Sequence, residues 1–424
     1  MAGSLGRDFS WALSSNIIYS ACQWGLVIEI AKLGTPADVG AYALGLAITS
    51  PILIFASFQA RNLVASDAHN EYNFNEYLTF RLTSLLVALF VLCGVVAVTR
   101  TSLSGAVVIL SVGLGQSFDC TSETYFGLLQ KHGRLDRVSL SLMLKGPLCL
   151  LLLGITMRLT HDIRYAVAAL AAGRCLILVF VDIHNAHVVS GCHRLIWNWA
   201  TQVRLLLTAL PLGVISGLAA VNLNIPRYFI EWDLNKHDLG IFSALASLVG
   251  AGNLVIAAFA SCTIVGLANA WATGDKRQYR SLSLRFLAIS AVMGSAGVFV
   301  ALLGGDRLLA MIFGSDYVGN AAVLAHIMIA GALGYLVSAQ GYTMTAARKL
   351  FQQIPALLAA AAVTGLSCWY LVPKRGLTGA ADSWVLGLVF LLAWNTILLA
   401  RMGVRSTPSS AWSASTVTQV LEKE

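Results

Sequence analysis

The sequence predicts an all-α, polytopic membrane protein with about twelve transmembrane helices, arranged as two six-helix bundles related by pseudo-two-fold symmetry. Its 424 residues are 57% hydrophobic and only 11% charged, with a mean hydropathy of +0.75. A soluble domain carries about 25% charged residues. Apolar runs of about 20 residues recur along the chain, which is the length a helix needs to cross a bilayer core. A short phrase also occurs twice.

The apolar runs divide the chain into twelve predicted spans joined by short loops. Lysine and arginine, Arg81 among them, are commoner in the loops on the N-terminal side, so we expect both termini in the cytoplasm. This bias accounts for much of the net charge of +8, which is therefore no sign of nucleic-acid binding. The Ser/Thr-rich residues 403–424 are expected to form a flexible cytoplasmic tail. The spans cover residues 10–33, 39–63, 80–99, 103–127, 138–157, 164–185, 203–229, 239–268, 283–303, 317–345, 353–372 and 380–400.

The repeated phrase opens the second and the eighth span. Asp38-Val-Gly-Ala-Tyr-Ala is followed 200 residues later by Asp238-Leu-Gly-Ile-Phe-Ser. We expect each aspartate to be a helix N-cap and each glycine to allow close packing of helices. Chance recurrence of a common helix start is the alternative. Duplication predicts two lobes, residues 1–200 and 201–402, related by an axis along the membrane normal.

Four stretches of the sequence carry a resemblance to a known group of exporters. They are AKLGTPADVGAYALGLAITSPI (31–52), ARNLVASDA (60–68), IPRYFIEWDLNKHDLGIFSALASLV (225–249) and FGSDYVGNAAVL (313–324). With the two six-span halves, they resemble the multidrug/oligosaccharidyl-lipid/polysaccharide exporter superfamily, and within it the bacterial polysaccharide flippase branch. The resemblance implies a V-shaped pair of six-helix bundles around a central cavity, in the bacterial cytoplasmic membrane. It also implies movement of undecaprenyl-pyrophosphate-linked sugars to the outer leaflet.

Candidate substrate ligands follow from the chemistry of such a cargo. A pyrophosphate-linked sugar needs cations shielded from lipid and polar side chains for its hydroxyl groups. Arg174 lies near the middle of the sixth span and Arg227 follows Pro226 in the seventh, and we expect both to face the cleft between the halves. A structural ion pair is the alternative for Arg174, and a surface position for Arg227. The other candidates, for which surface anchoring or helix–helix hydrogen bonding competes, are Lys145, Arg61, Asn16, Gln23 and Asn224.

Three acidic residues within spans are candidates for coupling to Na⁺ or H⁺, with a solvated or ion-paired role as the alternative. They are Asp119, Glu123 and Asp182. The cysteines and histidines have no metal-binding spacing, and the sequence contains no G-x-x-x-x-G-K-[ST] loop for a nucleotide. We therefore predict no cofactor, no metal and no enzymatic activity.

The leading hypothesis is a flippase for a lipid-linked anionic oligosaccharide that works by alternating access. A cation-coupled multidrug or metabolite exporter of the same fold is the first alternative, and a membrane glycan polymerase or ligase is the second. The expected partners are the lipid-linked oligosaccharide, the bilayer, and a glycan polymerase or other assembly proteins.

Overall fold

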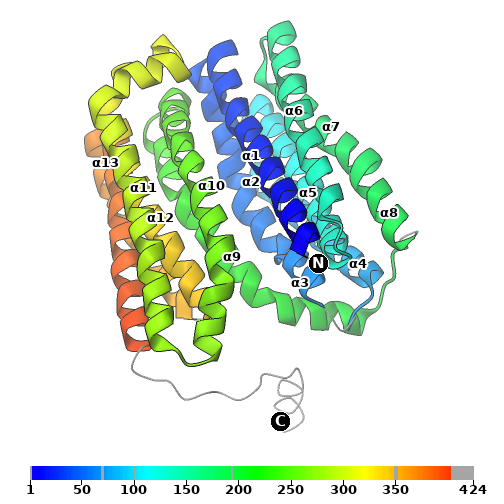
Figure 1. The fold of residues 1–424 in the computed structure, drawn as a ribbon. Helices are drawn as coiled ribbons and strands as arrows, with labels where there is room; N and C mark the ends of the chain where they lie inside the picture. The colour runs from blue at the N-terminus through cyan, green and yellow to red at the C-terminus, as the bar shows by residue number, and fades with distance from the viewer. Residues whose placement is uncertain (1, 68–70, 100, 192–193, 348–351, 403–424) are drawn as a thin grey trace.

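The computed structural model describes residues 2–67, 71–99, 101–191, 194–347 and 352–402, and every regular element in these ranges is a helix (Figure 1). The first half contains α1 (Ala2–Leu33), α2 (Pro36–Ser57), α3 (Ala60–Ser66), α4 (Phe74–Val98), α5 (Leu103–Lys131), α6 (Leu135–Thr160), α7 (Ile163–Ile177), the π-helix η1 (Leu178–Ile183) and α8 (His184–Ser190). The second half contains α9 (Trp199–Asp233), α10 (Lys236–Ala272), α11 (Lys276–Ile312), the 3₁₀-helix η2 (Ser315–Tyr317), α12 (Ala321–Ala346) and α13 (Gln353–Met402). The predicted tail, 403–424, lies outside the described residues.

The helices cover all twelve predicted spans: α13 covers the last two, α2 and α3 share the second, and α7, η1 and α8 share the sixth. Within the described ranges, 10 helices are long and apolar enough to cross a membrane. The polar α1 is not among them, and the 50-residue α13 counts once although it is broken at Gly376, where φ is 59° and ψ is −134°. Gly376 lies between the predicted spans 353–372 and 380–400, so α13 consists of two segments. The chain is therefore a multi-pass membrane protein, as predicted.

The helices pack into two bundles that meet along one seam. In the first bundle, α1 packs against α6, α2 against α5, and α7 against both α5 and α6. In the second, α11 packs against α12, while α13 packs against α9 and α12. The seam is formed where α2 contacts α9 and α10 (Figure 1). We call the side at which α1 begins the N-terminal side, and the side at which α1 ends and α2 begins the far side.

The two copies of the repeated phrase contact each other at the far side of this seam. A Cβ atom added to Gly40 would lie 1.9 Å from the carbonyl oxygen of Lys236. A Cβ atom added to Gly240 would lie 1.7 Å from the carbonyl oxygen of Pro36. The contact is reciprocal at an offset of 200 residues, so a pseudo-two-fold axis passes between the two glycines. Their missing side chains let the backbones of α2 and α10 touch.

The starts of α2 and α10 are capped three residues earlier than the sequence suggests. Thr35 is the N-cap of α2, and its side chain and that of Asp38 form a reciprocal capping box. Asn235 is the N-cap of α10 and accepts a 2.8 Å hydrogen bond from the amide of Asp238. The prediction that the aspartates are N-caps is therefore wrong: they occupy the third helical position. There the carboxylate still interacts favourably with the helix dipole.

We expect Thr35→Ala and Asn235→Ala each to lower the free energy of unfolding by about 1 kcal/mol, the usual cost of losing an N-cap side chain. Thermal unfolding of the purified protein in lipid measures this. Ser190→Ala, near the end of α8, is the control because it removes a hydroxyl that caps no helix start. Equal stability of the wild type and both cap variants would contradict the assignment.

Helix α9 contacts both bundles. Near its start, Leu205 and Ala209 are buried in a cluster with Phe58 of the first half. Further along, the Tyr228 hydroxyl donates a 2.5 Å hydrogen bond to the carbonyl of Ala47 in α2. The division of the chain at residue 200 stays a prediction, and α9 is the helix that ties the two proposed lobes together.

Candidate functional site

A buried group of charges lies between α5, α6 and α7 in the first bundle. Asp119 of α5 is its centre: the Lys145 Nζ atom of α6 and the Arg174 Nη1 atom of α7 each lie 3.2 Å from its carboxylate. The side chains of Lys145 and Arg174 are only 3% and 6% exposed, while that of Asp119 is 24% exposed. Tyr42 from the repeated phrase lies near Arg174. Two cations are thus held inside the bundle by one shared carboxylate.

Asp182 adds a second carboxylate from the π-helical turn η1. It is completely buried, and its Oδ2 atom lies 3.8 Å from Lys145 Nζ. Ser122 donates a 2.5 Å hydrogen bond to Asp182, and Ser141 donates another. Buried charges persist in proteins when they are paired and hydrogen-bonded in this way. Single π-helical turns often occur at functional sites, and this one places a carboxylate beside Lys145.

Arg61 and Glu123 form the exposed rim of the same group. Arg61 Nη1 lies 3.0 Å from Glu123 Oε2, and the two side chains are 33% and 42% exposed. The Phe126 ring lies next to both Arg61 and Lys145, with its centre 5.7 Å and 5.3 Å from their cationic groups. The Phe126 ring therefore lies between the exposed pair and the buried charges and contacts a cation of each.

The structure brings together two sets of residues that the sequence presented separately. Three predicted substrate cations and three predicted ion-coupling carboxylates form one charge-balanced group, which we call the six-charge network. Its members are Arg61, Lys145, Arg174, Asp119, Glu123 and Asp182. A substrate role for Arg174 stays a prediction, and it requires the pair with Asp119 to open.

Arg227 has a different environment from the cations of the network. Its Nη1 atom donates a 2.7 Å hydrogen bond to Asn224 Oδ1, one turn earlier on α9. Its Nε atom is buried and has no hydrogen-bond partner among the described residues, and no carboxylate there forms an ion pair with it. The next residue, Tyr228, reaches across the seam to α2. Arg227 therefore supplies a positive charge beside the seam, and no carboxylate among the described residues pairs with it.

Asn16 and Gln23 lie on α1, apart from these contacts. Asn16 is exposed and its side chain donates to the carbonyl of Ala12 at 2.7 Å. Gln23 is half-buried. Their predicted role in holding sugar hydroxyl groups stays a prediction.

Arg81 is the largest departure from the sequence interpretation. Expected at the membrane surface, it is only 2% exposed and lies inside the first bundle. It donates to Thr124 Oγ1 at 2.8 Å and to the Ala56 carbonyl, near the end of α2, at 3.4 Å. Position near the start of a span suggested a surface anchor, and only the packing of α4 against α2 and α5 shows the burial. Ser122 and Ser141 were likewise missed, because serines in apolar helices are too common to single out.

Comparisons with known proteins agree with this architecture. No family model matches the sequence. The capsular polysaccharide biosynthesis protein CapF of Staphylococcus aureus is 26% identical over 382 residues, which cover 88% of this chain and 94% of CapF. An inward-facing multidrug resistance MATE transporter of the MOP superfamily superposes with a TM-score of 0.72 at 13% identity, covering 94% of this chain and 99% of that one. The lipid II flippase MurJ, in an inward closed conformation, gives a TM-score of 0.74 at 10% identity over 93% and 87% of the chains. The chain therefore has the fold of the MATE and MurJ transporters and is similar in sequence to CapF along most of its length.

Proposed function

We propose that the protein moves lipid-linked oligosaccharides, the undecaprenyl-pyrophosphate-linked repeat units of a surface polysaccharide, from the inner to the outer leaflet of a bacterial cytoplasmic membrane. Arg227 carries this proposal, because a cation beside the seam with a free donor suits a pyrophosphate. The likeness to CapF, a capsular polysaccharide biosynthesis protein, and to the lipid II flippase MurJ supports the same cargo class.

Transport by alternating access follows from the seam. At the far side, the backbones of α2 and α10 touch at Gly40 and Gly240, so a bulky sugar cannot pass between them there. Release at that side requires the bundles to separate. In the predicted orientation the N-terminal side is cytoplasmic, so the structure corresponds to a state that is closed toward the outside.

The six-charge network is the candidate for coupling to an ion gradient. Protonation of Asp119 or Asp182, or binding of Na⁺ there, would weaken the pairs with Lys145 and Arg174 and free these cations for an anionic substrate. No bound nucleotide or cofactor is required by this scheme.

The alternative function is a cation-coupled exporter of drugs or metabolites. The half-buried Asp119 and the buried Asp182 favour it, because carboxylates within a membrane-spanning bundle suit Na⁺ or H⁺. Arg227, which has no carboxylate partner among the described residues, favours the anionic cargo instead. Efflux of a cationic dye that depends on Na⁺ or H⁺ and is lost in Asp119→Asn would select the alternative.

The test is deletion of the gene followed by measurement of lipid-linked repeat units in each leaflet and of glycan at the cell surface. We expect the units to accumulate in the inner leaflet. Complementation with Arg227→Gln should export glycan roughly tenfold to hundredfold more slowly, since a charge-assisted hydrogen bond contributes about 1.5–3 kcal/mol. Arg307→Gln, at an exposed position on the far side, is the control. Normal surface glycan after deletion, without a redundant carrier, would refute the function.

A further inference from the structure

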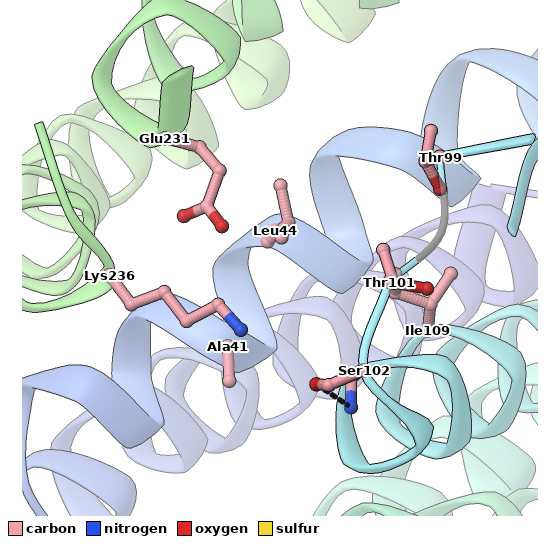
Figure 2. A pocket seen from close by; sticks show the side chains of 9 residues that line it. Ala41, Leu44, Thr99, Thr101, Ser102, Ile109, Glu231 and Lys236 are labelled. Carbon is pink, nitrogen blue, oxygen red and sulfur yellow. Dashed lines mark hydrogen bonds between the residues drawn. The ribbon is translucent and has the colours of Figure 1, made fainter. Parts of the chain in front are cut away.

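A polar pocket lies between the two bundles at the far side (Figure 2). Its volume is about 240 Å³. Glu231 at the end of α9 and Lys236 at the start of α10 line it from the second bundle. Thr101 and Leu44 line it from the first bundle. The pocket therefore exists only while the bundles are together at this side.

Two polar atoms of the pocket have no hydrogen-bond partner among the described residues. They are Glu231 Oε2 and Thr101 Oγ1, and both are buried. Glu231 and Lys236 both line the pocket, yet they do not approach closely enough to form an ion pair (Figure 2). A buried polar group without a partner is costly unless something else supplies the bond. The pocket thus offers an acceptor, a cationic donor and a hydroxyl to a ligand.

Part of the remaining wall is apolar, while Thr99 and Ser102 add two hydroxyl groups that are already hydrogen-bonded within the protein. Ala41 and Leu44 of α2 and Ile109 of α5 face the same space. The carboxylate of Glu231 disfavours an anion and the ammonium group of Lys236 disfavours a cation, which leaves a neutral ligand that both donates and accepts hydrogen bonds. A volume below the ~300 Å³ of pockets for drug-sized ligands limits it to a small one. A sugar ring meets these conditions, with C–H groups against the apolar wall and hydroxyl groups toward Glu231 and Lys236.

We infer that this pocket is a binding subsite for a single sugar ring, in which Glu231 and Thr101 form hydrogen bonds with the hydroxyl groups of the sugar. The inference rests on the proposed function and deepens it, because it gives the glycan a recognition site separate from the pyrophosphate site at Arg227. A sugar in the pocket contacts both bundles, so it stabilises the far-side-closed state. It loses Thr101 or Glu231 as soon as the bundles separate, and opening therefore weakens the hold on the sugar.

The experiment is calorimetric titration of the full-length protein in lipid nanodiscs with N-acetylglucosamine, galactose and the acyclic polyol sorbitol. We expect saturable binding of at least one ring sugar and none of sorbitol. Glu231→Gln and Thr101→Val should each weaken that binding at least tenfold. Asp233→Asn is the matched control, because it makes the same chemical change at an exposed position two residues away. Thermal unfolding of each variant confirms that it is folded.

Three outcomes would overturn the inference: no ring sugar binds to folded protein, sorbitol binds equally well, or Glu231→Gln leaves the affinity unchanged. Each is separable from failure of the proposed function. If the protein binds a sugar but the deletion strain exports glycan normally, the subsite stands and the flippase function fails. If export requires the protein but no sugar binds, the flippase function stands and the subsite fails.

Discussion

Gly40→Ala or Gly240→Ala is expected to prevent the two bundles from closing at the far side. The added methyl group would lie 1.9 Å or 1.7 Å from a carbonyl oxygen of the opposite helix, whereas a favourable contact needs about 3.5 Å or more. The obstacle is backbone, so no side chain can rotate away. Overpacking of this kind costs about 1–3 kcal/mol, which shifts the equilibrium between the closed and open states roughly fivefold to more than a hundredfold.

The helices themselves should tolerate the change. Alanine favours a helix over glycine by about 1 kcal/mol, so the variants should fold and insert normally while glycan export falls. Spin labels at Leu103 and Met311, exposed residues of the first and second bundles, report the far-side separation in a background without reactive cysteines. We expect a longer distance in both variants. Gly250→Ala, where a Cβ atom meets nothing within 4 Å, is the control. Unchanged distances in all three variants would show that the glycine contact does not set closure.

Asp119→Asn is expected to be the most destabilising conservative change in the first bundle. It leaves Arg174, which is 6% exposed, without a carboxylate, and leaves Lys145 with only Asp182 at 3.8 Å. Removing one partner of a buried ion pair costs about 3–5 kcal/mol, because the other charge stays buried. Unfolding of the purified protein by denaturant in mixed micelles measures the loss.

The double variant Asp119→Asn/Arg174→Met shows whether stability is lost because a buried charge has no partner or because side-chain packing is disturbed. It removes both members of one pair and keeps Lys145 beside Asp182, so it should regain more than half of the stability lost in Asp119→Asn. Asp136→Asn is the control: its 2.8 Å pair with Arg134 is exposed and should contribute less than about 1 kcal/mol. A double variant that is less stable than Asp119→Asn would contradict an electrostatic origin.

The sequence predicts how far along a membrane span each residue lies. It does not predict toward which neighbouring helix the side chain of that residue points. Apolar length defines a span, so all twelve segments were predictable, and the 200-residue offset between Asp38 and Asp238 predicted the pseudo-two-fold arrangement of the bundles. Which charges meet depends on how neighbouring helices are turned toward each other. The pairing of Asp119 with Arg174 and the burial of Arg81 depend on this and leave no mark in a single sequence.

The capping residues illustrate a smaller limit of the same kind. By composition alone, an aspartate before an apolar run fits the N-cap or the third helical position equally well. The structure decides for the third, because Thr35 and Asn235 already satisfy the first turn. Glu231 and Lys236 show a related limit, because they become the wall of a pocket only through contact with the other bundle.

The reciprocal contact of the two glycines has a consequence for how the repeats can diverge. Each copy of the phrase packs directly against the backbone of the other, since Gly40 meets the backbone near Gly240 and Gly240 meets the backbone near Gly40. A substitution at either glycine therefore disturbs the packing of both copies, so neither position can change independently of the other. Two residues further on, this constraint is gone: Tyr42 lies near Arg174, while Phe242 packs against Trp384. The halves of the molecule are thus kept alike where they touch and are free to specialise two residues away.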